Sequence, residues 1–215
     1  MNRVNISPSL LSADFTRLKD DIKLVEDLGV SRLHLDVMDG HFVPNLTFGP
    51  FIISDIRKIT NLHLETHLMI AEPHKYIKEY AKAGSDTIIV HYEASDNLDR
   101  DIKLIKDCNV LAGIAINPDT PISNIASYIP IIDYILIMSV FPGFGGQSFI
   151  DETLNKMKEA VRLCKNHCVT IGVDGGVNLK TIKPIYQTGI DVTIIGSALY
   201  GAHDITKRYQ DLTNG

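Results

Sequence analysis

The stretch LHLDVMDGHFVPN, residues 33–45, decides the fold of this 215-residue chain. Apolar and polar residues alternate over its first half, which predicts a β-strand. His34, Asp36 and Met38 then point to one side of the strand. His and Asp are poor strand formers, so that face is either exposed to water or carries chemistry. An Asp-Gly turn signal follows. The polar residues therefore lie at the carboxyl end of a strand, where α/β enzymes keep their reactive groups.

Composition limits the class of protein. Hydrophobic residues make up 45% of the chain and charged residues 22%, so a large core under an ordinary surface is expected. The net charge is -5 and no Lys/Arg-rich run occurs, which argues against nucleic acid or an anionic membrane as partner. No apolar run reaches the length of a membrane span. The first residues, MNRVNISP, lack the apolar region of a secretory signal.

The three cysteines, Cys108, Cys164 and Cys168, indicate a reduced, cytoplasmic compartment without a disulfide framework. Cys164, His167 and Cys168 have a spacing that could hold a metal, but no fourth ligand lies nearby. We therefore expect Cys164 to be a core residue of a helix.

Short apolar strands alternate with helical stretches along the whole chain. Eight strands are predicted, at residues 5–9, 33–38, 62–69, 87–91, 111–117, 134–139, 170–174 and 192–196. Helices are predicted between and after them, at residues 14–28, 51–59, 73–84, 97–106, a short piece after Pro121, 151–165, 179–187 and a last one ending near residue 210.

This order predicts one domain over residues 1–215, an α/β fold of the (β/α)8 TIM-barrel type. No linker or low-complexity segment interrupts it. Several strands are continuous apolar runs, as expected when both faces of a parallel sheet are covered. The competing fold is an open, doubly wound sheet, but its G-x-G-x-x-G fingerprint is absent after the first strand.

Few polar residues stand at the carboxyl ends of the predicted strands, and two histidines and two carboxylates are among them. These residues are Ser9, His34, Asp36, His67, Ser139 and Asp174. Any one of them could be a satisfied core histidine or a helix cap. Together, two His and two Asp suit Zn²⁺, Fe²⁺, Mn²⁺ or Co²⁺, and the donor set does not select one. His63 and Glu65 alternate with His67, so a competing ligand assignment stays open.

Three glycine-rich loops follow the last three strands. They are PGFGGQ at residues 142–147, DGG at 174–176 and IGSA at 195–198. Glycine lets backbone N–H groups approach an anion closely, and the last loop opens a helix. Loops after strands seven and eight are the usual phosphate site of this fold. The sequence therefore predicts a phosphate site built without Lys or Arg.

The chain resembles the ribulose-phosphate 3-epimerase family over nearly its whole length. The motifs that carry the resemblance are PSLLSADF (8–15), LHLDVMDGHFVPN (33–45), HLMI (67–70), NPDTP (117–121), MSVFPGFGGQSFI (138–150) and VDGGVN (173–178). Two positions depart from the family pattern. Phe141 stands where Asn is common, and Glu65 where Asp is common, which leaves substrate preference slightly open.

The resemblance implies a set of roles. One divalent metal per subunit, Zn²⁺ or Fe²⁺ before Mn²⁺ or Co²⁺, would be bound by His34, Asp36, His67 and Asp174. Asp36 and Asp174 would be the acid/base pair, and Met38, Met69 and Met138 would line the reaction centre. Substrate would contact Ser9, His67, Gly143, Phe144, Gly145, Gly146, Asp174, Gly175, Gly176, Gly196 and Ser197. The partner is a small phosphorylated ketose, and the chain is expected to form a homo-oligomer of undetermined size.

The expected reaction interconverts D-ribulose 5-phosphate and D-xylulose 5-phosphate in the pentose phosphate pathway, by proton transfer at C3 through an enediolate. Three alternatives differ from it in identifiable ways. D-Allulose-6-phosphate 3-epimerase would use the same residues on a longer sugar. A decarboxylase or aldolase would have Asp-x-Lys-x-x-Asp on a strand, but Met38 stands where the lysine belongs. A sugar-phosphate binding module would need no paired carboxylates. The role of the loop at residues 39–45 stays open, although we expect it to fold over the substrate.

Overall fold

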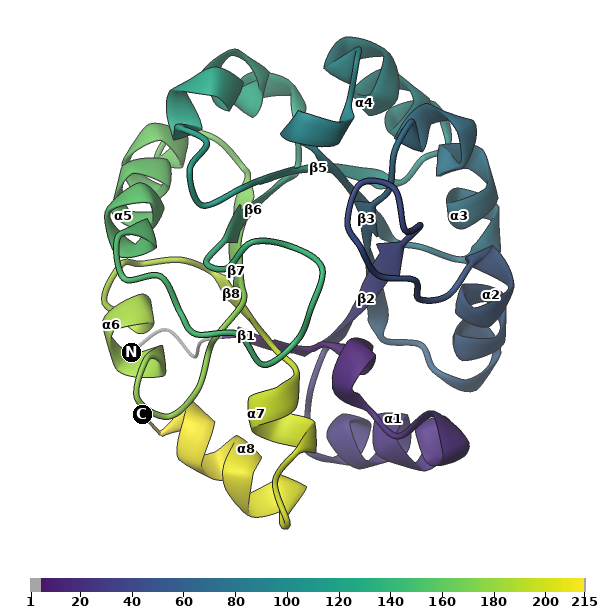
Figure 1. Ribbon diagram of the computed structural model, residues 1–215, viewed down its shortest axis with the longest axis vertical. Helices are drawn as coiled ribbons and strands as arrows, with labels where there is room; N and C mark the ends of the chain where they lie inside the picture. Colours follow the sequence, from purple (N-terminus) through teal and green to yellow (C-terminus); the bar gives the residue numbers. More distant parts are fainter. Residues whose placement is uncertain (1–4, 215) are drawn as a thin grey trace.

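Eight parallel strands form a closed barrel in the computed structural model, which describes residues 5–214 (Figure 1). From β2 to β8 each strand pairs with its neighbour in sequence, and β8 pairs with β1. A parallel bridge between Ser9 and His34 joins β1 to β2 and closes the ring. The strands are β1 (Asn5–Pro8), β2 (Arg32–Met38), β3 (His63–Met69), β4 (Thr87–His91), β5 (Leu111–Ile116), β6 (Tyr134–Met138), β7 (Thr170–Asp174) and β8 (Val192–Ile195). The predicted (β/α)8 barrel is confirmed.

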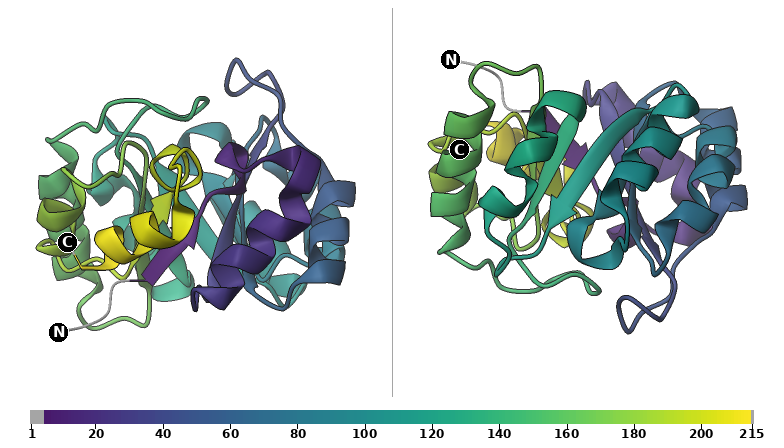
Figure 2. Two further views of the ribbon diagram at one scale, coloured as in Figure 1. Left: turned by 90° about the horizontal axis from the view of Figure 1, so that it is seen from below. Right: turned by 90° about the horizontal axis from the view of Figure 1, so that it is seen from above.

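Helices surround the barrel and run back from the end of each strand to the start of the next (Figures 1 and 2). They are α1 (Leu18–Asp27), α2 (Pro50–Ile59), α3 (Ile77–Ala83), α4 (Leu98–Asp107), α5 (Thr153–Cys164), α6 (Ile182–Tyr186), α7 (Ser197–Tyr200) and α8 (Ile205–Thr213), with the 3-10 helices η1 (Leu10–Ser12), η2 (Phe15–Arg17), η3 (Pro73–Lys75), η4 (Tyr92–Ala94) and η5 (Ile122–Ile131). None of the helices in the described part of the chain is long and apolar enough to cross a membrane.

Four predicted helices differ from the structure in their type or in how they divide. The predicted helix 14–28 begins with a separate 3-10 turn, because the Asp14 side chain accepts a hydrogen bond from the N–H of Thr16 and caps that turn. The segment opened by Pro73 divides in the same way, into η3 and α3. After Pro121 the chain forms the 3-10 helix η5, whose Pro130 lacks an N–H donor. The last predicted helix is two, α7 and α8.

The apolar core lies between the strands and the surrounding helices. Leu33, Leu35 and Val37 of β2 belong to it, whereas His34 and Asp36 point into the barrel. The sequence prediction for the two faces of this strand is therefore confirmed. The Cys164 side chain packs in the same core, as expected.

The inside of the barrel has an apolar half and a polar half. The apolar half comes mainly from β4–β8 and consists of Ile89, Ala115, Tyr134, Leu136, Met138, Val192 and Ile194. The polar half comes from β1–β4 and includes Ser7, His34, Asp36, Glu65, His67 and His91, all buried. Burying polar groups costs free energy unless they find partners, so this half of the interior is a candidate site.

Candidate active site and metal centre

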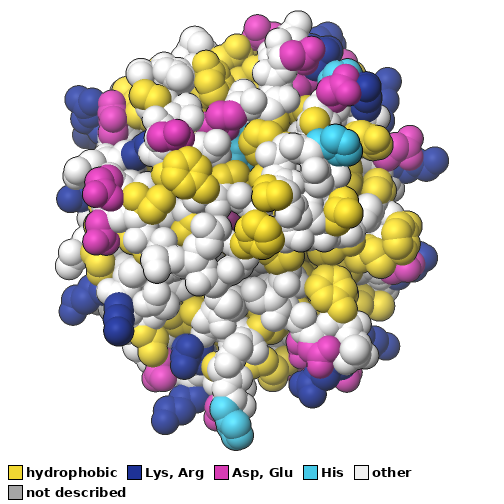
Figure 3. All heavy atoms as spheres, viewed as in Figure 1, with side chains coloured by type: hydrophobic (Ala, Val, Ile, Leu, Met, Phe, Trp, Pro, Cys, Tyr) yellow, Lys and Arg dark blue, Asp and Glu magenta, His cyan; other side chains and the backbone are white. Residues whose placement is uncertain are grey.

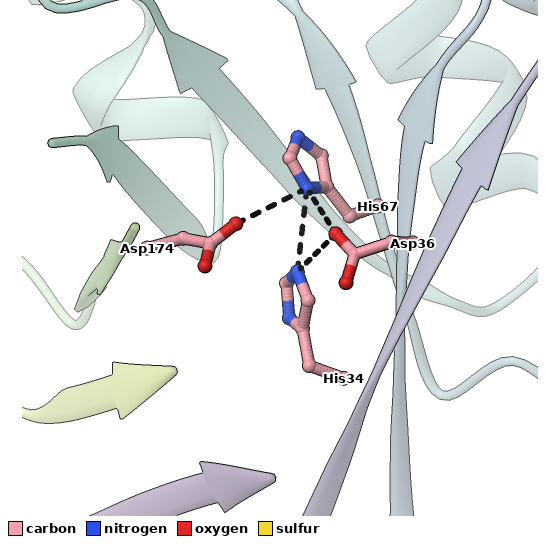
Figure 4. Close-up of side chains that lie close together, drawn as sticks. All are labelled: His34, Asp36, His67 and Asp174. Atoms are coloured by element: carbon pink, nitrogen blue, oxygen red, sulfur yellow. Dashed lines mark hydrogen bonds and ion pairs between the residues drawn. The ribbon is translucent and has the colours of Figure 1, made fainter. Parts of the chain in front are cut away.

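Two histidines and two aspartates meet at one point inside the barrel. Asp36 on β2 lies directly beside His67 on β3 in the strand register, and His34 stands two residues earlier on the same face of β2. Asp174 ends β7 and reaches the group from the other side, as Figure 4 shows. One donor atom from each of the four lies within 4.8 Å of the other three. The group could therefore hold a metal ion.

The spacing of these donor atoms fits a small divalent cation. His34 Nε2 lies 3.3 Å from His67 Nδ1, and Asp36 Oδ1 lies 3.5 Å and 3.3 Å from the same two nitrogens. Ligands about 2.0–2.1 Å from a tetrahedral ion stand roughly 3.3 Å apart. The Oδ2 atom of Asp174 is farther, 3.9 Å from His67 Nδ1.

Glu65 and His63 do not join this group. Glu65 lies behind His34, with its Oε2 atom 3.5 Å from His34 Nδ1. It also accepts hydrogen bonds from Ser7 Oγ at 2.8 Å and from Arg32 Nη1 at 2.6 Å. The Nε2 atom of His63 lies 2.7 Å from Thr87 Oγ1. Among the described residues, only the four predicted ligands form a metal-competent cluster. The competing assignment has no geometric support.

The two aspartates are in different electrostatic states. Burial and the nearby negative charge of Asp36 raise the pKa of Asp174 to about 7. Burial also opposes ionisation of Asp36, but the neighbouring His34 and His67 outweigh it and hold the Asp36 pKa far below its ordinary value. One carboxyl therefore holds a proton easily while the other stays ionised.

The two histidines differ as well. Burial opposes the charged form of His34, but Asp36 and a hydrogen bond to Glu65 outweigh it and raise its pKa to about 10. Burial lowers the pKa of His67 to about 3. A divalent ion binds the unprotonated nitrogen, so it would displace any proton from His34 Nε2.

A pocket of about 550 Å³, part of it open to solvent, lies above this cluster. Its wall contains the predicted substrate-contacting residues other than His67, and all three predicted methionines: Ser9, Gly143, Phe144, Gly145, Gly146, Asp174, Gly175, Gly176, Gly196, Ser197, Met38, Met69 and Met138. Asp36 also lines this pocket. His34 and His67 are fully buried and do not line it. Figure 3 shows this face, with most charged side chains around its rim.

Two glycines of the loop after β7 stand where no side chain fits. A Cβ atom on Gly176 would lie 2.5 Å from the backbone N of Phe149, and one on Gly175 would lie 2.4 Å from Val140 Cγ2. Both residues have positive φ, at 66° and 112°, which L side chains rarely adopt. Ser139 Oγ donates hydrogen bonds to the carbonyls of Asp174 and Gly175, so the ends of β6 and β7 are tied together.

The loop after β2 contacts the loop after β6 at the mouth of the pocket (Figure 1). Asn45 Nδ2 donates a 2.7 Å hydrogen bond to the carbonyl of Gly143. Val43 packs with Met38 and Met69 in a small buried cluster. The Asp39 carboxylate accepts hydrogen bonds from the N–H groups of His41, Phe42 and Ala71, which fixes the start of the loop.

Some pocket residues were not predicted. They are Leu11, Ser12, Val140, Pro142, Gln147, Val177 and Ile194. Most of them lie within the sequence motifs of the family resemblance, and that position could have identified them as pocket residues. His91 and Glu93 were also not singled out, although they continue the polar network behind His67.

Solved structures share the fold of this chain. The chain resembles KGPDC from Streptococcus mutans with a TM-score of 0.71 at 16% identity, covering 99% of this chain and 97% of that one. It resembles 3-hexulose-6-phosphate synthase from Salmonella typhimurium with a TM-score of 0.71 at 17% identity, covering 98% and 97%. At this identity the likeness shows the fold alone, a TIM barrel.

Sequence relatives define the family. The model of the ribulose-phosphate 3 epimerase family matches residues 5–200. Ribulose-phosphate 3-epimerase of Bacillus subtilis is 45% identical over 212 residues, covering 97% of this chain and 98% of that protein. The enzyme of the same name from Synechocystis is 43% identical over 213 residues, covering 97% and 93%. The chain therefore belongs to the ribulose-phosphate 3-epimerase family, whose members are isomerases.

Proposed function

We propose that the protein interconverts D-ribulose 5-phosphate and D-xylulose 5-phosphate by moving a proton at C3 between two carboxyl groups. The observation that carries this proposal is that Asp36 and Asp174 line the same pocket and lie on opposite sides of the two histidines (Figure 4). Family membership supports the same substrate class.

The residues fit the divalent ion that the resemblance implies. His34, Asp36, His67 and Asp174 would hold it, one ion per subunit, with Zn²⁺ or Fe²⁺ expected before Mn²⁺ or Co²⁺. When bound, it would act as a Lewis acid that stabilises the negative charge of an enediolate by several kcal/mol.

The proton chemistry belongs to the two aspartates. Inversion at C3 requires removal of a proton from one face of the carbon and delivery to the other. The ionised member of the pair removes the proton, and the protonated member delivers one. The opposite pKa shifts of Asp36 and Asp174 support a resting state in which Asp174 holds a proton and Asp36 is ionised. The two roles exchange when the reaction runs backwards, because the group that delivers the proton in one direction removes it in the other.

The remaining predicted residues bind and shield the substrate. Ser9 stands beside Asp36, where it can reach a substrate oxygen. Met38, Met69 and Met138 would provide a polarizable wall without exchangeable protons. The phosphate group would lie against the backbone of Gly143, Gly145, Gly146, Gly175, Gly176 and Gly196, beside Phe144 and Ser197. His67 is fully buried and does not line the pocket, so it would act on the substrate only through the metal group.

The proposal extends to the whole chain. We infer that residues 1–215 form one catalytic domain, of which residues 1–4 and 215 lie outside the described part. We infer a homo-oligomeric assembly from the family resemblance. The free thiols of Cys108, Cys164 and Cys168 support the reduced, cytoplasmic location expected from the sequence.

The proposal is tested with purified, metal-loaded protein and two substrates. D-Ribulose 5-phosphate should be converted to D-xylulose 5-phosphate with a far higher kcat/KM than D-allulose 6-phosphate is converted to its epimer. The Asp174→Asn variant serves as the matched inactive control. Preference for the hexose would replace the proposal by D-allulose-6-phosphate 3-epimerase, and turnover of neither sugar would overturn it.

A further inference from the structure

A second pair of polar side chains continues the network behind His67, on the side away from the metal group. His67 Nε2 lies 2.8 Å from His91 Nε2, and His91 Nδ1 lies 3.1 Å from Glu93 Oε2. The strand register explains the first contact. His67 on β3 pairs with Ile89 on β4, so His91 comes two residues later on the same inner face. The two imidazole rings stack with centroids 4.9 Å apart, and His91 is fully buried.

The direction of the hydrogen bonds from His67 to His91 and from His91 to Glu93 follows from where a metal would bind. Nδ1 of His67 faces the other ligand atoms, so its lone pair must be free and the ring hydrogen must sit on Nε2. Nε2 then donates to Nε2 of His91, which has to accept. The hydrogen of a neutral His91 is therefore on Nδ1, from which it donates to the Glu93 carboxylate.

Glu93 is fixed as an acceptor. Its Oε1 atom accepts hydrogen bonds from the backbone N–H of Asn117, at 2.8 Å, and from the Thr120 hydroxyl. Burial works against ionisation of Glu93, but the hydrogen bonds from His91, Thr120 and Asn117 outweigh it and hold its pKa at about 2. An ionised carboxylate can only accept, so it orients both imidazoles in sequence.

This orientation opposes a competing one. Oδ1 of Asp36 lies 3.3 Å from His67 Nδ1 and would accept a hydrogen from it. A neutral imidazole carries one ring hydrogen, so the two carboxylates, Asp36 and Glu93, compete for its position. A hydrogen on Nδ1 would block the metal-facing lone pair.

We propose that His91 and Glu93 are positioning residues that hold the hydrogen of His67 on Nε2 and so leave Nδ1 free to bind a divalent cation. The inference rests on the metal role proposed for His67. Carboxylates behind metal-binding histidines fix the ring tautomer and strengthen the ligand. Here Glu65 stands directly behind His34, whereas Glu93 acts on His67 through an intervening imidazole.

The Glu93→Gln variant tests the proposal because it reverses the polarity without changing the shape. The Asn117 N–H would hold the amide oxygen, so the amide NH₂ would face His91 Nδ1. His91 would then carry its hydrogen on Nε2 and force that of His67 onto Nδ1. Co²⁺ affinity, followed by the visible absorption of the bound ion, should fall about 10- to 100-fold. In the metal-free protein, ¹⁵N NMR of the imidazoles should show the His67 hydrogen moving from Nε2 to Nδ1.

Two further variants separate positioning from structural damage. Thr120→Val removes a hydrogen bond to the same carboxylate but leaves its polarity, so Co²⁺ affinity should change far less. In His91→Gln, the amide oxygen can accept from His67 while the NH₂ donates to Glu93, so affinity should exceed that of Glu93→Gln.

The outcomes distinguish this inference from the proposed function. Wild-type Co²⁺ affinity together with an Nε2 hydrogen on His67 in Glu93→Gln would overturn the inference. A wild-type protein that binds no divalent ion would overturn the metal role. In that case, comparing the His67 tautomer in the wild-type and Glu93→Gln proteins would still decide whether Glu93 determines that tautomer.

Discussion

Ser9 Oγ donates a 2.6 Å hydrogen bond to Oδ2 of Asp36. The other oxygen of this carboxylate, Oδ1, faces the two histidines. Asp36 therefore directs one carboxylate oxygen to the metal group and the other to Ser9. Ser9 and Asp36 both line the pocket. The bond links the end of β1 to β2 at the point where the barrel closes.

Loss of this hydrogen bond should affect turnover more than substrate binding. In Ser9→Ala, Asp36 loses a charged hydrogen bond of about 1.5–3 kcal/mol, which corresponds to roughly a 10- to 100-fold lower kcat. Metal content should stay unchanged, because Oδ1 keeps its place. Steady-state kinetics with metal analysis checks this, and a change confined to KM would contradict it.

Removal of either proton carrier should abolish turnover. Asp36→Asn and Asp174→Asn each replace a carboxyl group by an amide of the same shape that cannot exchange the proton. We expect kcat to fall by at least about 10²–10⁴-fold, the usual contribution of general acid–base catalysis. Circular dichroism should show an intact fold. Near-normal activity in either variant would mean that the two-base scheme is wrong.

Removal of the metal should also abolish turnover, and adding a divalent ion back should restore it. His34→Ala removes one of the four donor atoms, so bound metal and activity should decrease together. Chelator treatment of the wild-type protein should inactivate it, and Zn²⁺, Fe²⁺, Mn²⁺ or Co²⁺ should be compared for reactivation. A fully active, metal-free preparation would exclude the Lewis-acid role.

The metal-free protein should lose stability as pH rises above about 6.5. The pKa of Asp174 is raised to about 7 and that of His34 to about 10, so both groups hold protons more tightly in the folded state. Their contributions are present below the unfolded pKa values, 3.8 and 6.5, and are lost as pH rises through the folded ones. His67, with its pKa lowered to about 3, acts in the opposite sense and offsets Asp174 below pH 6.5.

Urea unfolding of the metal-free protein at pH 6.5 and 8.5 measures this effect. The free energy of unfolding should be lower at pH 8.5, and Asp174→Asn should show a smaller difference between the two pH values. Equal or greater stability at pH 8.5 in the wild-type protein would contradict the expected proton binding.

A position inside the barrel should tolerate only glycine. A Cβ atom on Gly172 would lie 2.2 Å from the buried hydroxyl of Tyr134, which has no hydrogen-bond partner among the described residues. Gly172→Ala should destabilise the protein by about 1–3 kcal/mol through overpacking. Tyr134→Phe in the same chain should recover part of the loss, measured by denaturant unfolding. A neutral Gly172→Ala substitution would show that the interior relaxes more easily than expected.

The sequence was informative about the fold because apolar periodicity identifies strands and their faces directly. The two faces of β2 follow from residue alternation, and the order of strands and helices leaves few alternatives to a barrel. The 3-10 segments were missed because local capping, such as that by Asp14, competes with helical periodicity without changing it.

The site could be predicted from the sequence only where its residues stand near the ends of strands. His34, Asp36, His67 and Asp174 stand at such ends, and the structure brings them together. The network behind them was missed because it depends on register between strands. Nothing local shows that His91 reaches His67 across β3 and β4, or that Glu65 stands behind His34 instead of joining the cluster.

The most direct test of the two-base mechanism is the origin of the C3 hydrogen in product formed during a single turnover in D₂O. With enzyme in excess over D-ribulose 5-phosphate, Asp36 and Asp174 act from opposite faces, and the carboxyl that delivers the hydrogen has exchanged with solvent. Mass spectrometry and NMR of the D-xylulose 5-phosphate should then show deuterium at C3 in essentially every molecule. Product that retains the substrate's own hydrogen at C3 would contradict the two-base mechanism.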